Sequence, residues 1–486
     1  MNLLIRKTVG DIEAAAAASV LRREFGPVGL TFLGVGATIG AGVFVLTGTA
    51  AANYAGPAVA LSFTFAAIAC LCAGLCYAEL ASMIPVAGSA YTYTYVSMGE
   101  LLAWIIGWSL VLEYLFAAST VAVGWSGYFS AFASDLGFIL PKALTTAPFM
   151  FKEGALQFSG ALINLPAFTV VAAMVMVLHL GIRTSARTNS AMVLLKVGVI
   201  LLVIIVGAAH VDTRNWHPFI PPNTGQPGEF GWSGVVRAAG VVFYAYIGFD
   251  TVSASSQEAC NPTRDVPLAI LATLAICTIL YVSMALVITG LAPYPMLNVP
   301  HPIYVAVEQA GPTIAWLKPI IGVSVIVGLA SAVLVTLYGQ TRIFYSMSRD
   351  GLIPPIFSKV NVTTGVPTFN TWFVGGLAAS IAALLPIDLL GELVSIGTLL
   401  AFSIVCAGVL VLRVTTPNAV RRFRVRAVWP VATVGLLMCL YMMFSLPGAT
   451  WSRFLVWLLV GMLIYAFYGY RSSKLRRSLA AELQRQ

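Results

Sequence analysis

Apolar stretches of about 20 residues recur from residue 30 to residue 470, and they constrain the fold more than any other feature of the sequence. A membrane-spanning helix needs about 20 mostly apolar residues, because hydrocarbon admits only backbone that is hydrogen-bonded internally. With 59% hydrophobic and 9% charged residues, the composition excludes a water-soluble globular protein. The sequence predicts an all-α membrane protein with twelve transmembrane helices, at residues 30–52, 57–79, 99–123, 161–181, 189–209, 234–256, 267–291, 319–341, 369–387, 390–412, 427–446 and 451–470.

The basic residues are unevenly distributed around these spans. Twenty of the 27 Lys and Arg residues fall before span 1, after spans 4, 6, 8 and 10, or after span 12, whereas six fall in the opposite loops or at the span ends next to them, and Lys196 lies within a span. Because Lys and Arg accumulate in cytoplasmic loops, we expect both termini in the cytoplasm. The net charge of +9 is then explained by topology and by contacts with anionic lipids, and it does not indicate nucleic-acid binding.

The predicted spans and the basic ends of the chain divide it into four parts. Residues 1–29 form a cytoplasmic arm without the apolar core and cleavage site of a signal peptide, so none is predicted. Spans 1–10 occupy residues 30–412, spans 11 and 12 occupy residues 413–470, and a basic cytoplasmic tail covers residues 471–486. The sequence leaves the oligomeric state open, with a monomer as the simplest arrangement.

Span 1 contains the glycine-rich stretch GVGATIGAGVFVLTG, from Gly34 to Gly48, at a depth where an intact helix is expected. Unpaired backbone groups are tolerated in a bilayer only where they line a cavity enclosed by protein, so an interrupted helix here predicts a ligand site. Alternatively, Gly36 and Gly40 permit close packing of intact helices, as small residues do in membrane proteins. The stretch alone leaves both interpretations open.

Span 6 favours the first interpretation. It carries Gly248 and the ionisable Asp250 near its centre, and it opens a second group of spans as the glycine-rich stretch opens the first. Interrupted helices at corresponding places in two halves are typical of secondary transporters with inverted repeats, here spans 1–5 and 6–10. A broken helix offers free N–H groups to a carboxylate and free carbonyls to an ammonium group. The two breaks together predict a site for a zwitterion such as an α-amino acid.

Ionisable residues occur at depths where a charge costs at least about 2.5 kcal/mol and therefore indicates a partner or a function. Lys196 in span 5 is a candidate proton carrier, with snorkelling to the surface as the alternative. Glu113 in span 3 could pair with Lys196, hold a structural hydrogen bond or contact the substrate. Asp250 is expected to cap or orient the second half of span 6, with a substrate contact as the alternative. Glu79 and Glu258 lie near cytoplasmic ends, where a gating network or simple solvation is expected.

Other functional classes fit the sequence less well. The seven Cys and four His residues are too scattered for a disulfide framework or a metal site, and neither a metal nor a cofactor is expected. An intramembrane hydrolase needs a nucleophile with a base or two facing aspartates, and neither is evident. A channel needs a repeated filter or a charged ring. A carrier is therefore favoured, and no enzymatic activity is expected.

Four long motifs resemble those of the amino acid-polyamine-organocation superfamily, and most of all its bacterial cationic amino acid transporter-like branch. In chain order they are GATIGAGVFVLTG, CYAELASMIPVAGSAYTYTYVSMGE, FYAYIGFDTVSASSQEACNPTRDVPLAI and LYGQTRIFYSMSRDGLIP. The resemblance covers nearly the whole chain. It implies the inverted-repeat fold, location in a bacterial inner membrane, and transport of amino acids by alternating access, often coupled to protons.

The resemblance also assigns roles to residues. Thr38 matches the position whose carbonyl meets the substrate amine, Gly40 lies beside it in the break, and Ala41 and Gly42 match the N–H groups that face the carboxylate. Lys196 matches a lysine that stands where sodium-coupled relatives bind sodium. Many relatives carry Ser or Thr at the position of Ala41, so a hydroxyl contact to the carboxylate is missing here.

On spans 6 and 8 the resemblance implies a second set of substrate contacts. The carbonyl-bearing positions are Tyr244, Ala245 and Ile247, and the Tyr244 ring matches a gating aromatic. Leu329 and its neighbours Ala330 and Ser331 should border the pocket without supplying a carboxylate. Because an unpaired buried cation is costly, we expect proton-coupled uptake of small neutral amino acids such as alanine. Two alternatives stay open, namely an amino acid exchanger and, through Glu113, a transporter of cationic amino acids.

Overall fold

The computed structural model describes residues 5–8, 23–152, 155–226, 228–299, 301–446 and 448–483. Arg22 of the expected N-terminal arm and residues 484–486 of the expected tail lie outside these ranges. The described chain is built almost entirely from helices, with one two-stranded antiparallel β-hairpin between α7 and α8, β1 (Phe149–Lys152) and β2 (Ala155–Phe158).

In the first half of the chain, long apolar helices alternate with short turns of 3₁₀ or π helix, which carry the label η. Their order is α2 (Pro27–Thr38), η1 (Gly42–Leu46), α3 (Thr47–Ala50), η2 (Ala51–Ala55), η3 (Gly56–Ala58), α4 (Val59–Met83), α5 (Ala90–Ser97), α6 (Glu100–Asp135), α7 (Lys142–Thr145), α8 (Leu165–His179), α9 (Ile182–Ala208) and η4 (Thr213–Trp216).

The second half continues in the same manner. Its elements are α10 (Gly231–Val242), η5 (Phe243–Tyr246), α11 (Thr251–Ala254), η6 (Ser256–Glu258), α12 (Pro262–Leu291), η7 (Tyr294–Leu297), α13 (Pro302–Gln309), η8 (Pro312–Ile314), α14 (Leu317–Arg349), η9 (Pro355–Ser358), α15 (Thr368–Leu384), α16 (Ile387–Thr415), α17 (Val428–Phe444), α18 (Gly448–Ile464), η10 (Tyr465–Gly469), α19 (Tyr470–Ser472) and α20 (Lys474–Leu483).

Each predicted span coincides with apolar helix. In the described ranges, eight helical segments are long and apolar enough to cross a membrane, and α2, α8, α15 and α17 are shorter apolar helices. Several helices extend beyond the predicted limits. For example, α6 continues to Asp135 and α9 begins at Ile182. The reason is that hydropathy detects only the apolar part of a helix, whereas backbone hydrogen bonding continues through polar residues at its ends.

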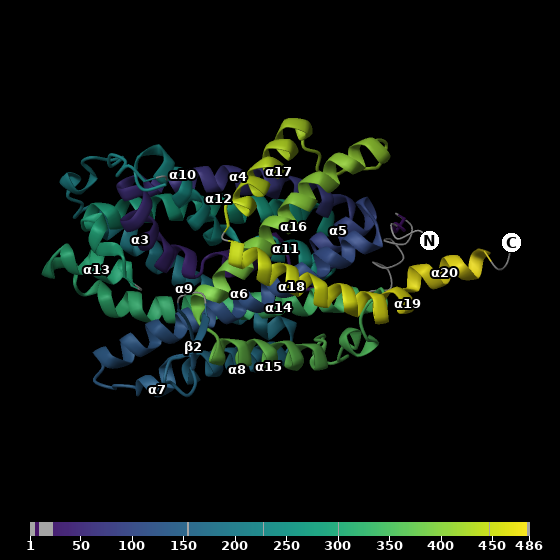
Figure 1. Ribbon diagram of the computed structural model, residues 1–486, viewed down its shortest axis with the longest axis horizontal. Helices are drawn as coiled ribbons and strands as arrows, with labels where there is room; N and C mark the ends of the chain where they lie inside the picture. Colours follow the sequence, from purple (N-terminus) through teal and green to yellow (C-terminus); the bar gives the residue numbers. More distant parts are fainter. Residues whose placement is uncertain are drawn as a thin grey trace.

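The long helices α6 and α14 lie at the centre of the bundle and are buried along most of their length, whereas α17 and α18 expose large apolar side chains at its periphery. Figure 1 shows α19 and α20 at one end of the molecule and α13 at the opposite end. We call the first end the terminal face. The burial pattern places the shared core around α6 and α14, where any enclosed site must lie.

Contacts from several loops meet at the terminal face. The Lys7 ammonium lies 2.5 Å from the Asp350 carboxylate, and the backbone N–H of Lys474 donates to the Asp350 carbonyl. Nearby, Cys260 N–H donates to the carbonyl of Phe25, and Arg183 pairs with Glu24. The segments expected on one side of the membrane, before span 1 and after spans 4, 6, 8 and 12, therefore lie together.

Candidate functional site

Two helices at the centre of the fold are interrupted where the sequence predicted breaks. The first helix ends at Thr38, Ile39 takes an extended conformation with ψ 96°, and helical structure resumes as a π turn at Gly42. The second passes from α10 into the 3₁₀ turn η5, and Ile247 is extended with ψ 135°. Gly248 follows with φ +118°, a conformation that glycine adopts without strain. These departures release backbone groups from helical hydrogen bonding at both places.

The two interruptions pack directly against each other. A Cβ atom added to Gly42 would lie 2.3 Å from the Cα of Ala245, and one added to Gly248 would lie 2.9 Å from the backbone of Ala37. Only glycine at positions 42 and 248 permits this approach. Other glycines of the first stretch fit the packing interpretation, since a Cβ on Gly36 would meet the Asn189 side chain at 2.5 Å. The glycine-rich stretch therefore fits both interpretations, because Gly42 lies at the interruption and Gly36 permits close helix packing.

Tyr281 of α12 connects the two interruptions by hydrogen bonds. Its hydroxyl lies 2.9 Å from the carbonyl oxygen of Thr38 and 2.9 Å from that of Ala245. The hydroxyl has one hydrogen to donate, so the two carbonyls share it. These carbonyls were expected to receive the substrate amine, and here each already has a partner on one of its two lone pairs. Sequence reasoning missed Tyr281, although a tyrosine hydroxyl deep in an apolar span must find an acceptor.

Lys196 of α9 is fully buried behind the first interruption. Its ammonium nitrogen lies 2.9 Å from the Gly36 carbonyl, 2.8 Å from the Ile39 carbonyl and 2.9 Å from the Ser331 hydroxyl. All three ammonium hydrogens thus have acceptors, and neither snorkelling nor a pair with Glu113 is observed. The charge is held by one carbonyl before the break, one carbonyl in the break and the Ser331 hydroxyl of α14, where Ser331 was expected to border the pocket.

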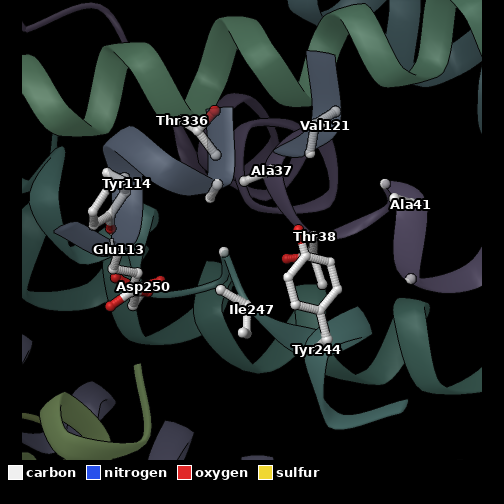
Figure 2. A pocket seen from close by; sticks show the side chains of 14 residues that line it. Ala37, Thr38, Ala41, Glu113, Tyr114, Val121, Tyr244, Ile247, Asp250 and Thr336 are labelled. Atoms are coloured by element: carbon white, nitrogen blue, oxygen red, sulfur yellow. Dashed lines mark hydrogen bonds between the residues drawn. The ribbon is translucent and has the colours of Figure 1, made fainter. Parts of the chain in front are cut away.

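A small cavity of about 30 Å³ lies between the interruptions, α6 and α14. Most of the expected substrate contacts line it, whereas Ala245 and Leu329 do not. Lys196, the expected proton carrier, does not line it either. Its volume leaves room for a few water molecules, so an amino acid fits only after the walls move apart. Figure 2 shows Thr38 and Tyr244 on one side of this space. The lining residues are Ala37, Thr38, Gly40, Ala41, Gly42, Glu113, Tyr114, Ala117, Val121, Tyr244, Ile247, Gly248, Asp250 and Thr336.

Two carboxylic acids close one end of the cavity. Glu113 and Asp250 lie next to each other in Figure 2, and both are buried. The Tyr114 hydroxyl donates to Asp250 Oδ2 and accepts from Thr251 Oγ1. Within the described part of the chain, Glu113 Oε2 and Asp250 Oδ1 have no hydrogen-bond partner. The sequence did not reveal this pair, because Glu113 and Asp250 are far apart along the chain and approach only through packing.

Glu79 and Glu258 both take part in buried ion pairs near the terminal face. Glu79 accepts from Arg413 at 2.6 Å and also approaches Arg421 at 3.3 Å. Glu258 accepts from Arg342 Nε at 2.7 Å and from the Tyr338 hydroxyl. Of the two interpretations that the sequence left open, these contacts favour a network over simple solvation. The Glu258 pair ties the end of the second interrupted helix to α14.

Comparison with known proteins identifies the family. A model of the amino acid permease family matches residues 25–467. The chain belongs to the amino acid permease family. The resemblance drawn from the four motifs is therefore correct, and the chain is a multi-pass membrane transporter and not an enzyme.

Three relatives are similar to this permease along most of its length. A branched-chain amino acid permease of Bacillus subtilis is 46% identical over 97% of this chain and 98% of its own. A methylthioribose transporter of the same organism is 42% identical over 98% of this chain and 100% of its own. A vacuolar cationic amino acid transporter of Arabidopsis thaliana is 38% identical over 86% of this chain and 68% of its own.

Proposed function

We propose that this permease takes up neutral amino acids together with protons by alternating access. The observation that carries the proposal is the ammonium of Lys196, bound to the carbonyl of Gly36 in the last turns of α2 and to that of Ile39 in the break itself. A buried ammonium depends on these acceptors. A rearrangement that opens the break removes them from the ammonium and favours release of its proton. Proton movement is thereby linked to the conformational change.

The substrate backbone is proposed to bind between the two interruptions. The N–H groups of Ala41 and Gly42 begin the second half of the first broken helix, where the helix dipole favours a carboxylate. The amine then faces the carbonyls of Thr38, Tyr244, Ala245 and Ile247. Because Tyr281 already donates to two of these carbonyls, we infer that it keeps them oriented while their second lone pairs stay available.

The lining around this position favours an uncharged side chain. Ala37, Ala117, Val121 and Ile247 supply apolar surface. The adjacent acids repel each other when both are ionised, so we infer that at least one of Glu113 and Asp250 is protonated, which lowers the negative charge that faces the cavity. The similarity to a branched-chain amino acid permease supports aliphatic substrates. A role for Glu113 in proton coupling follows from the same pair.

A cationic substrate is the second candidate. If both acids are ionised, Glu113 and Asp250 present two negative charges to the cavity. These charges would compensate the buried positive charge of a lysine or arginine side chain. The similarity to a cationic amino acid transporter points the same way. A thermal-shift screen of the purified protein against the common amino acids separates the candidates, because a ligand that binds the folded state raises the melting temperature. Stabilisation by arginine and lysine, without valine or alanine, would exclude the neutral class.

The finer architecture is also a proposal. We infer twelve spans in a bacterial inner membrane, with spans 1–5 and 6–10 as inverted repeats within residues 30–412, two appended helices within 413–470, and a cytoplasmic arm and tail. The gathering of the basic loops at the terminal face supports a cytoplasmic location for both termini. The ion pairs of Glu79 and Glu258 and the ring of Tyr244 then act as gates that must open for release.

Uptake into liposomes under an imposed pH gradient tests the coupling. The wild type should accumulate a labelled neutral amino acid, and Lys196→Ala should lose the part of uptake driven by the gradient while it still binds substrate in a thermal-shift assay. Wild-type gradient-driven uptake by the variant would rule out the coupling role. An obligate exchanger would be silent in empty liposomes and active after preloading with unlabelled amino acid, which distinguishes the remaining alternative.

A further inference from the structure

A groove of about 540 Å³ lies near the terminal face, between the start of α12 and the loop that joins α16 to α17. It is separate from the central cavity and shares no lining residue with it. One wall comes from the first turns of α12 and the other from the basic loop. The groove is lined by Thr263, Arg264, Pro267, Leu268, Leu271, Arg422 and Phe423.

The loop that carries Arg422 is held in place on both sides of this residue. The Arg421 guanidinium donates to the carbonyls of Leu412 and Thr416 at the end of α16 and pairs with Glu79. The backbone of Phe423 exchanges hydrogen bonds with the Ser82 hydroxyl of α4. These contacts fix the backbone on either side of Arg422, so the loop presents Arg422 and Phe423 to the groove. The site is therefore built before any ligand arrives.

The two arginines of the groove differ from their neighbours in having no acidic partner. Arg413 and Arg421 both pair with Glu79. In the described ranges, neither Arg264 nor Arg422 forms an ion pair or a side-chain hydrogen bond, and both are exposed. The nearest acid along α12, Asp265, is buried and accepts from the backbone N–H of Asn261. Two unpaired guanidiniums on separate elements thus face one space, at the positive end of a helix.

Apart from Thr263, the remaining lining is apolar, and it continues along the lipid-facing side of α12. Leu268 is 52% exposed, and Leu271 lies one turn further along the span. Guanidinium groups bind phosphate through paired hydrogen bonds, and basic pockets near the ends of membrane spans bind lipid headgroups. A soluble phosphate would leave the apolar side chains without a partner, whereas an acyl chain would cover them.

We propose that this groove binds an anionic phospholipid, with its phosphate between Arg264 and Arg422 and an acyl chain along Leu268 and Leu271. The bound lipid bridges α12 and the α16–α17 loop, two elements that are not adjacent in sequence. It also adds a negative charge beside the Glu79 network, which the Arg421–Phe423 segment connects to the groove. The proposal does not depend on which amino acid is transported.

Native mass spectrometry of the full-length protein in detergent tests the proposal. The protein is titrated with phosphatidylglycerol and, separately, with phosphatidylcholine of the same acyl chains. The wild type should retain phosphatidylglycerol in preference to phosphatidylcholine. The double variant R264Q/R422Q should lose about tenfold in phosphatidylglycerol binding and keep its phosphatidylcholine binding. L268Q should weaken the binding of both lipids, because it leaves the charges intact and removes an acyl-chain contact.

The matched control is R424Q/R426Q, which removes two exposed arginines of the same loop that do not line the groove. It should bind phosphatidylglycerol as the wild type does. Equal losses in the two double variants would mean a diffuse charge effect and would overturn the site. Displacement of phosphatidylglycerol by glycerol phosphate at equal concentration would also overturn it, because the groove would then recognise phosphate alone. Unchanged melting temperatures in the variants show that folding is not the cause.

Discussion

The ammonium of Lys196 donates a 2.8 Å hydrogen bond to the carbonyl of Ile39, the first residue that leaves the helical conformation after α2. The same ammonium also binds Gly36, before the break, and Ser331 on α14. One buried charge therefore connects three segments of the core. The interrupted helix explains how this charge is tolerated, because it offers carbonyls that an intact helix would use internally.

Ser331→Ala removes one of the three acceptors of this ammonium. A hydrogen bond to a charged group contributes about 1.5–3 kcal/mol, so we expect proton-driven uptake to fall about tenfold or more. The measurement is the initial rate of uptake into liposomes under a pH gradient. Ser324→Ala is the control, since the Ser324 hydroxyl on the same helix is buried without a partner among the described residues. Equal rates in the two variants would contradict the role of Ser331.

Gly42→Ala tests the contact between the two interruptions. The new Cβ would lie 2.3 Å from the backbone of Ala245, so the broken helices must separate at a cost of about 1–3 kcal/mol. We expect a lower melting temperature and loss of substrate binding. Gly40→Ala is the matched comparison, because the nearest atom to its Cβ would be 3.6 Å away, which is ordinary contact. If both variants bind substrate like the wild type, the close approach is not needed.

Tyr281→Phe removes the hydroxyl that joins the carbonyls of Thr38 and Ala245. Leaving a buried carbonyl unsatisfied costs about 1–3 kcal/mol, so the variant should melt at a lower temperature and bind substrate more weakly. Thermal unfolding in detergent, with and without substrate, gives both quantities. Tyr77→Phe should be neutral or stabilising, because the buried Tyr77 hydroxyl has no partner within the described chain. A drop of the same size for Tyr77→Phe would show that ring packing, not the bridge, is measured.

Glu258→Ala leaves the Arg342 guanidinium buried without its carboxylate. Removing one partner of a buried ion pair costs about 3–5 kcal/mol, whereas replacing both by apolar residues of similar volume is often neutral. We therefore expect a large fall in melting temperature for the single variant and a smaller one for Glu258→Leu combined with Arg342→Met. A double-mutant cycle measures the difference. Additive effects would mean that the two residues do not interact.

Much of the helical framework could be predicted from the sequence, because a helix buried in hydrocarbon requires a long apolar run, and each run can be recognised from its own residues. The breaks near Ile39 and Gly248 were also predictable, since glycine density and an ionisable residue at depth are local signals. Helix ends were less predictable. The extension of α6 to Asp135 lies in a mixed segment of aromatic, Ala, Gly and Ser residues, and the extension of α9 back to Ile182 lies in a polar one.

Partners across the fold could not be predicted, because spacing along one chain does not fix which helices face each other. The sequence left Glu113 with three possible roles, and packing placed it beside Asp250. Tyr281 lies in a predicted apolar span in which no residue pointed to a function, yet its hydroxyl is hydrogen-bonded to both interrupted helices. Leu329 was expected at the pocket and is buried elsewhere on α14, whereas Thr336 of that helix lines the cavity.

The sequence by itself determined that this chain spans a membrane repeatedly and that two of its helices are broken at depth, since both follow from how single residues behave in hydrocarbon. Only the tertiary structure decided which groups the two breaks present to each other. It also decided that the Lys196 ammonium is hydrogen-bonded to backbone carbonyls and that Glu113 lies beside Asp250. The physical reason is that charges and carbonyls in a low-dielectric interior are stabilised by neighbours within a few ångströms, and only the packing of helices chooses those neighbours.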